Sequence, residues 1–218
     1  MINITKYASV NMDVNTYILA KNNRVLIIDP GFNGEKIINH INNYSMKIEG
    51  IIFTHGHYDH IKDLTLLLDP QVPIYIHEDE VDFLYNPDLN LSSMFNQKFI
   101  LGKDMLVKAL KDGEKIKFQN EVLKTIHLPG HTKGSMGIIY NQHFFSGDTL
   151  FYDSIGRTDL PTGNGGKIFA SLKKIKETLS KSTICYPGHG KGGRLLEIMA
   201  KNPYFLNINW NYRQEDFS

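Results

Sequence analysis

The sequence contains one cysteine, Cys185, among 218 residues, so it can form no internal disulfide. It also lacks a long apolar run, because strand-like segments such as 25–28 fall far short of the ~18 residues of a membrane span. Excess charge of one sign is missing too, since 24 Lys and Arg face 23 Asp and Glu, for a net charge of +1. Neither nucleic acid nor a membrane is therefore expected as a partner, and a neutral or mixed-charge ligand fits better.

The beginning of the chain, residues 1–6, lacks the basic and then apolar pattern of a signal peptide, so we expect a cytoplasmic protein. The composition, 41% hydrophobic and 11% aromatic, excludes a disordered or collagen-like chain. At roughly 100–200 residues per domain, and with no linker-like stretch, we expect a single domain over residues 1–218.

Short β-branched runs alternate with helical patterns, which is typical of an α/β layered domain. Apolar periodicity predicts helices at 35–41, 60–68, 167–179 and 193–201. We expect strands at 2–7, 16–20, 24–28, 51–54 and 73–77, and then a mostly antiparallel set at 115–118, 122–128, 136–140, 143–146 and 183–186.

Two segments have no clear periodicity. The stretch 85–105 reads as a long loop or short helix, and its apolar residues either form a lid or pack onto the domain; these are Leu89, Leu91, Met94, Phe95 and Phe99. The aromatic tail, 202–218, either clamps the core or contacts a second copy of the chain, so a homo-oligomer stays open. The glycines at 163–166 lack the G-K-[ST] ending of a phosphate loop and indicate a plain turn.

Histidine is the most informative residue type. The segment Thr54-His55-Gly56-His57-Tyr58-Asp59-His60 places three imidazoles and a carboxylate directly after a predicted strand. Zinc and similar metals take these ligands, and alternating side chains on a tight turn can converge on two neighbouring ions. Further candidates follow other predicted strands beside glycines, namely His131, Asp148 and His189.

Five of the nine histidines lie in these segments. One alone could be a hydrogen-bonded histidine at the end of a loop, but five in the same local setting, with Asp59 and Asp148, favour a metal centre. The other four histidines lie on a predicted helix or strands and are interpreted as surface or packing residues: His40, His77, His127 and His143.

The ordered motifs resemble a known family, the metallo-β-lactamase-fold hydrolases, and within it the single-domain glyoxalase-II-like (hydroxyacylglutathione-hydrolase-like) branch. The resemblance covers residues 1–201 and rests on Ile28-Asp29-Pro30-Gly31, Thr54 to His60, Leu128-Pro129-Gly130-His131-Thr132, Phe145-Ser146-Gly147-Asp148-Thr149-Leu150 and Pro187-Gly188-His189-Gly190. It implies an α/β fold, the four-layer αββα sandwich with mixed or mostly antiparallel sheets and metals at one edge.

The resemblance also implies a ligand set for two divalent metal ions, with zinc as the first expectation and iron or manganese as alternatives. It places His55, His57 and His131 around one ion. It places Asp59, His60 and His189 around the second, with Asp148 bridging the two and Asp29 supporting the metal loop.

Two departures from the branch concern the substrate. The helical domain with which glyoxalase II binds its thiol cofactor is not expected in a chain of this length. Arg157 stands where the thioesterases typically have lysine and the persulfide dioxygenases arginine, and Asp159 replaces a tyrosine. Arg157 either grips an acidic substrate tail or pairs with Asp159 at the surface.

The expected nucleophile is a metal-bound water held by Asp59 and Asp148, since two ions can lower the pKa of a bridging water towards ~7. The sequence has no Ser-His-Asp order, and Cys185 on an apolar strand favours a structural role. With no obvious acid for the leaving group, thioesters or lactones are favoured over amides.

We therefore predict a metal-dependent hydrolase of a small thioester. The alternatives are a mononuclear iron persulfide dioxygenase, suggested by the sequence 156–159, and a lactonase. A metal-binding sensor or interaction module without turnover is the non-enzymatic alternative. The β-lactamases are disfavoured, because a bridging Asp148 is a feature of the thioesterase-like branches.

Overall fold

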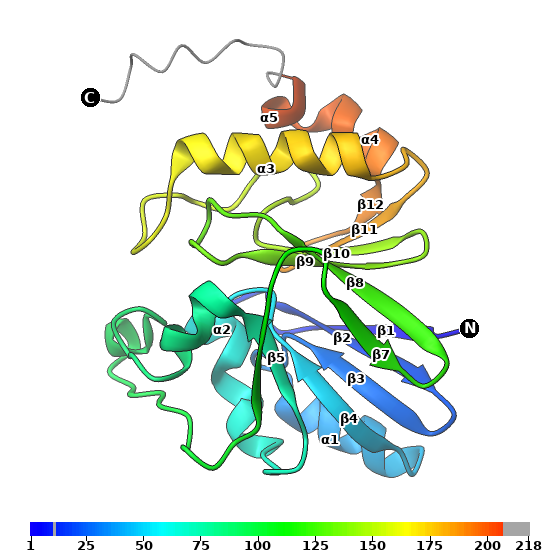
Figure 1. Ribbon diagram of the computed structural model, residues 1–218, viewed down its shortest axis with the longest axis vertical. Helices are drawn as coiled ribbons and strands as arrows, with labels where there is room; N and C mark the ends of the chain where they lie inside the picture. The colour runs from blue at the N-terminus through cyan, green and yellow to red at the C-terminus, as the bar shows by residue number, and fades with distance from the viewer. Residues whose placement is uncertain (11, 207–218) are drawn as a thin grey trace.

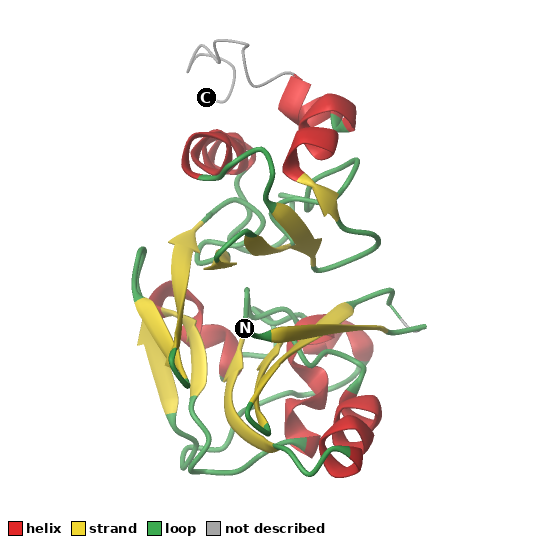
Figure 2. Ribbon diagram, turned by 90° about the vertical axis from the view of Figure 1, so that its right-hand side faces the viewer, coloured by secondary structure: helices red, strands yellow, loops and turns green. Residues whose placement is uncertain are grey.

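Two six-stranded β-sheets lie against each other, with helices on their outer faces, in the computed structural model, which describes residues 1–10 and 12–206 (Figure 1). Seen from the side, the strands form the middle of the molecule and helices lie at both ends (Figure 2). The predicted αββα sandwich is confirmed.

The first sheet has its strands in chain order. They are β1 (Asn3–Ala8), β2 (Asn15–Lys21), β3 (Arg24–Ile28), β4 (Lys47–Ile52), β5 (Ile74–His77) and β6 (Val107–Leu110). The pairs β1/β2 and β2/β3 are antiparallel, whereas β3 to β6 run parallel, so this sheet is mixed.

The second sheet also follows chain order and is antiparallel except for the parallel pair β10/β11. Its strands are β7 (Lys115–Phe118), β8 (Glu121–His127), β9 (Met136–Tyr140), β10 (His143–Gly147), β11 (Ile184–Pro187) and β12 (Gly193–Arg194).

Helices cover the outer face of each sheet. Beside the first sheet lie α1 (Gly34–Asn43), α2 (Tyr58–Ile61) and three 3₁₀ helices, η1 (Lys62–Leu66), η2 (Glu78–Leu84) and η3 (Ser92–Phe95). Beside the second lie α3 (Gly165–Thr178), α4 (Leu195–Lys201) and α5 (Pro203–Leu206). None of these described helices combines the length and the apolar character that crossing a membrane requires.

Strand β2 shows how the sequence builds the layers. Tyr17 and Leu19 face the second sheet in the central core, whereas Ile18 and Ala20 pack with the helices on the other side. All four are buried, because successive strand residues point to opposite faces and both faces are covered.

Three local predictions differ from the structure. The predicted helix 60–68 is the short α2 followed by η1, and its buried Ile61, Leu64 and Leu67 are spaced by three residues, the period of a 3₁₀ helix. The predicted helix 193–201 begins with the two-residue strand β12. Strand β6 was not predicted, since its Lys108 and Ala109 are weak strand formers and it is fixed by pairing with β5.

The segment 85–105 and the tail are only partly as expected. The segment contains η3, and buried Asn90 fixes its base by donating to the carbonyls of Phe83 and Phe99. In the tail, Phe205 of α5 is buried in one apolar cluster with residues of α3 and α4. The rest of the predicted tail contact, 207–218, lies outside the described residues.

Candidate metal centre

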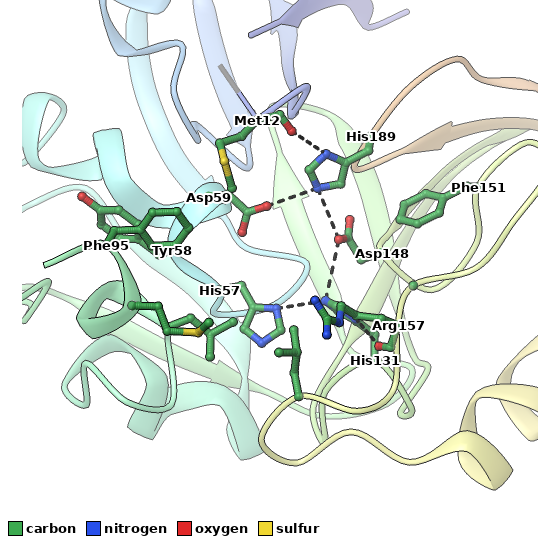
Figure 3. Close-up of a pocket in the computed structure, with 14 residues that line it drawn as sticks. Met12, His57, Tyr58, Asp59, Phe95, His131, Asp148, Phe151, Arg157 and His189 are labelled. Atoms are coloured by element: carbon green, nitrogen blue, oxygen red, sulfur yellow. Dashed lines mark hydrogen bonds and ion pairs between the residues drawn. The ribbon is translucent and has the colours of Figure 1, made fainter. Parts of the chain in front are cut away.

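The seven predicted ligands converge at one edge of the two sheets, because each follows the carboxyl end of a strand. His55, His57, Asp59 and His60 come after β4 in the first sheet. The other three follow strands of the second sheet, namely His131 after β8, Asp148 after β10 and His189 after β11. Both sheets therefore contribute to one site (Figure 3).

His55, His57 and His131 form the first group. Nδ1 of His57 lies 2.9 Å from Nε2 of His131, which lies 3.2 Å from Nε2 of His55. His131 donates its Nδ1–H to the carbonyl of Arg157. His55 donates its Nδ1–H to the hydroxyl oxygen of Thr54, and that hydroxyl donates its own hydrogen to Asp29. The Nε2 atoms of His55 and His131 therefore carry lone pairs that face each other.

Asp59, His60 and His189 form the second group. His60 donates its Nδ1–H to Asp29, and Nδ1 of His189 lies 3.1 Å from the carbonyls of Met12 and Asp13. Nε2 of His60 lies 3.4 Å from Nε2 of His189, and Oδ2 of Asp59 lies 3.2 Å from the same Nε2 of His189. Here two imidazole nitrogens and a carboxylate meet, and the charges of Asp148 and Asp59 outweigh burial and raise the pKa of His189 to about 10 without a metal.

Asp148 lies between the two groups. Its Oδ1 is 3.4 Å from Nε2 of His60, and its Oδ2 is 3.3 Å from Nε2 of His189 and 3.7 Å from Nε2 of His131. Among the described residues, neither Oδ1 of Asp148 nor the buried Nε2 of His57 has a hydrogen-bond partner. Asp148 thus has the position expected of a bridging carboxylate.

This donor set fits divalent cations. The lone pairs of His55 and His131, both buried, face each other at 3.2 Å and repel unless a positive charge lies between them. Burial lowers the pKa of His57 to about 3, so at neutral pH it is the uncharged imidazole that a metal requires. The outer ring nitrogens of four ligands are each held by an oxygen, which fixes the ring orientations as in known metal sites; these ligands are His55, His60, His131 and His189.

Asp29 supports the loop after β4. Its Oδ1 accepts the Thr54 N–H at 2.8 Å, and its Oδ2 accepts the Thr54 hydroxyl and the His60 ring nitrogen. The carboxylate is almost fully buried, at 1% exposure. Asp29 therefore orients His60 directly and His55 through the Thr54 hydroxyl.

Glu80 in η2 is a supporting residue that the sequence reasoning missed. Its carboxylate is buried and accepts the N–H of Gly56 at 2.9 Å and that of Gly134 at 2.8 Å. Gly56 lies between two predicted ligands, and Gly134 follows His131 by three residues. Glu80 thus connects the ligand loops of the two sheets. The acidic run Glu78-Asp79-Glu80 reads in sequence as a solvated surface and gave no signal of this role.

Gly188 allows the closest approach in the centre. A Cβ atom there would lie 2.0 Å from Oδ1 of Asp148 and 2.8 Å from the His60 ring. We expect Gly188→Ala to displace Asp148 and to lower the affinity for metal at least tenfold. Titration of the metal-free protein measures this, with Gly165→Ala at the start of α3 as control, where the nearest atom to a Cβ lies at 3.6 Å. Equal metal affinity of the Gly188 variant and the unaltered protein would contradict the assignment.

A cavity of ≈ 350 Å³ opens onto the centre and falls within the size range of small-molecule sites. Tyr58 and Phe95 lie on one side of it and Arg157 on the other (Figure 3). Arg157 borders the cavity as predicted, but its exposed guanidinium binds Asp159 through two 2.7 Å contacts. Its part in substrate binding stays a prediction.

The four remaining histidines lie away from the cavity. His40 contacts the hydroxyl of Tyr7, and His143 that of Tyr186. The rings of His77 and His127 stack at 4.0 Å, with Asp79 nearby as a third possible ligand. Stacked parallel rings direct their nitrogens alongside rather than towards each other, so packing explains this pair better than a metal.

Two further sequence interpretations concern chemistry outside the centre. Cys185 is buried in β11, and burial raises the pKa of its thiol to about 12, which leaves it unreactive at neutral pH. The glycine-rich turn at 163–166 begins α3, where the Asn164 side chain accepts the Lys167 N–H as an ordinary helix cap.

The chain is similar to known metal-dependent proteins in sequence. The sequence profile of the Metallo-beta-lactamase superfamily matches residues 11–189. A Streptococcus pyogenes protein named as a probable metallo-hydrolase is 34% identical over 202 residues, 88% of this chain and 85% of that protein.

Two solved structures are also similar over most of the chain. The BLEG-1 B3 metallo-beta-lactamase superposes with a TM-score of 0.85 at 30% identity, covering 93% of this chain and 99% of its own. A protein designated TTHA1623, in a di-iron-bound form, superposes with a TM-score of 0.78 at 28% identity, covering 92% and 99%.

Proposed function

Since the chain belongs to the metallo-beta-lactamase superfamily, we propose that it is a metal-dependent hydrolase that cleaves a small thioester, as glyoxalase-II-like enzymes do. One observation carries the proposal: five of the seven predicted ligands line an open cavity, namely His57, Asp59, His131, Asp148 and His189. A site that served only to bind a metal ion would need no opening large enough for a substrate.

The cavity lining supports hydrolysis by water. None of the described lining residues is serine, cysteine or lysine, so no side chain there offers the usual covalent nucleophile. Two divalent ions held by the seven ligands would supply hydroxide at neutral pH and polarise the substrate carbonyl. Asp59 and Asp148, which line the cavity, would hold the attacking water.

The same lining restricts the leaving group. Arg157 cannot donate a proton, because its bond to Asp159 raises its pKa further. The Tyr58 hydroxyl points away from the histidines in Figure 3. A thiolate, whose conjugate acid has a pKa near ~8.5, leaves without an acid, and a lactone alkoxide stays within the ring, whereas an amine requires protonation. Thioesters, with lactones next, therefore suit the cavity better than amides.

Two other reactions are favoured by particular observations. The di-iron form of TTHA1623 makes iron a reasonable metal here, and iron is what persulfide dioxygenation requires. The similarity to BLEG-1 brings β-lactam hydrolysis into consideration. A cephalosporin and a thiol persulfide therefore belong in the same screen as the thioesters.

The test combines metal analysis with this screen. We expect about two zinc, iron or manganese ions per chain and hydrolysis of a small thioester, with both reduced in His57→Ala and neither in the surface variant His143→Ala. Fewer than about one metal per chain, with no loss in His57→Ala, would discard the metal centre. Oxygen consumption with the persulfide but no hydrolysis would replace thioester hydrolysis by dioxygenation.

A further inference from the structure

The wall of the cavity opposite Arg157 is apolar. Tyr58 and Phe95 lie on this side with Met12 above them (Figure 3), and the apolar Leu91 and Met94 also line the cavity. Three of these side chains are open to solvent: Met94 at 71%, Phe95 at 45% and Met12 at 45%. Exposed apolar side chains gathered beside a reaction centre indicate a surface that a ligand covers.

The backbone of Leu91, which is part of this wall, is held in a strained conformation. Its φ of 68° is in the left-handed region, which bulky residues rarely adopt and where glycine or asparagine would be unstrained. The flanking residues hold it there, because Asn90 and Ser92 are fully buried and Ser92 accepts the Phe99 N–H. Strain held by its surroundings is characteristic of ligand sites.

The charges around the cavity agree with an apolar ligand. Apart from the predicted metal ligands, Arg157 is the one charged residue among the described lining residues, and Asp159 already binds its guanidinium through both oxygens. An acidic substrate tail would have to displace that carboxylate. An uncharged hydrocarbon chain needs no such exchange.

We propose that the wall formed by Met12, Tyr58, Leu91, Met94 and Phe95 is a subsite for an unbranched apolar chain of the substrate, so that the enzyme prefers medium-chain thioesters to short or acidic ones. This rests on the proposed thioester hydrolysis. The shared chemistry is the hydrocarbon chain, which can belong to the acyl group or to the thiol.

Two substrate series separate these sources. In the first, acetyl, butanoyl, hexanoyl and succinyl groups are carried on one small uncharged thiol; in the second, the acetyl group is carried on thiols of increasing chain length. A half-covered methylene contributes about a twofold gain, so we expect kcat/KM at least tenfold higher for hexanoyl than for acetyl, or the same increase in the thiol series. No increase in either series, or succinyl better than butanoyl, would overturn the subsite.

Variants connect the preference to the wall. Phe95→Ala is expected to lower the ratio of hexanoyl to acetyl kcat/KM at least threefold, and the ratio stays unchanged in Ile100→Ala, whose side chain is 59% exposed outside the cavity. Leu91→Asn removes apolar surface while relieving the backbone, so the ratio falls and the melting temperature does not. A lower melting temperature with an unchanged ratio would make Leu91 merely structural.

Binding keeps the subsite testable apart from turnover. We expect the metal-loaded protein to bind hexanoate at least tenfold more tightly than acetate, or hexanethiol at least tenfold more tightly than ethanethiol, in calorimetry, and Phe95→Ala to reduce this difference. If no thioester is cleaved but the difference in binding remains, thioester hydrolysis is wrong and the apolar subsite stands. If thioesters are cleaved and the difference is absent, the subsite is wrong and the proposed function stands.

Discussion

Replacing Asp148 with asparagine is expected to remove one of the two metals and to lower thioester hydrolysis at least about 100-fold. The loss of a contact that merely orients a ligand typically costs 10–100-fold in metal affinity or activity, and Asp148 faces both groups directly. Asparagine keeps the shape but loses the negative charge, and its amide group would direct N–H bonds at a bound cation.

Metal analysis and kcat/KM measured on the same preparation check this expectation. The control is Asp153→Asn, an exposed aspartate five residues further along the chain and outside the cavity. It is expected to keep both metals and full activity. If Asp148→Asn kept both metals and full activity, the bridging role would be wrong.

Replacing Glu80 with alanine is expected to destabilise the protein by about 2–6 kcal/mol, because two buried N–H groups each lose their acceptor at about 1–3 kcal/mol. Glu80→Gln keeps the size and one acceptor oxygen, so about 1–3 kcal/mol is expected. Metal affinity should fall about 10–100-fold in both, since Gly56 lies within the ligand loop.

Chemical unfolding of the metal-free protein and metal titration measure the two effects. The control is Glu78→Gln in the same 3₁₀ helix, where the side chain is 48% exposed and the expected change is within about 0.5 kcal/mol. If Glu80→Ala were as mild as this control, Glu80 would not connect the two loops.

Glu80 also gives the metal-free protein a pH dependence of known sign. Burial raises its pKa to about 7 from 4.5, and the bonds from Gly56 and Gly134 oppose this only in part. The folded state therefore holds the proton more tightly than the unfolded chain, and this contribution to stability is lost as pH rises from about 4.5 through about 7. Glu80→Gln is expected to remove that slope.

The convergence of the seven predicted ligands could be predicted from the sequence because the pattern is local and repeated. Four of them lie in the six residues 55–60, and the others lie beside glycines after strands. The layered fold followed from the alternating strand and helix patterns. Finding this cluster thus required little knowledge of long-range packing.

The supporting residues could not be predicted, because their roles depend on packing between distant segments. Glu80 is buried only because the loops after β4 and β8 close over it. Leu91 looked like one of several apolar residues in an irregular segment, and its left-handed backbone is set by buried Asn90 and Ser92. Strand β6 exists through its pairing with β5 rather than through its own residues.

The distribution of ligands over both sheets has a consequence for synthesis of the chain. The first group needs His131, and the second needs His189, which follows β11 near the end of the described chain. Because strand β11 pairs with β10, His189 reaches the other ligands only after most of the chain has left the ribosome. A nascent chain that stops before His189 can contain the first group but cannot assemble the second, so a metal in the second group would be bound only by an almost complete fold.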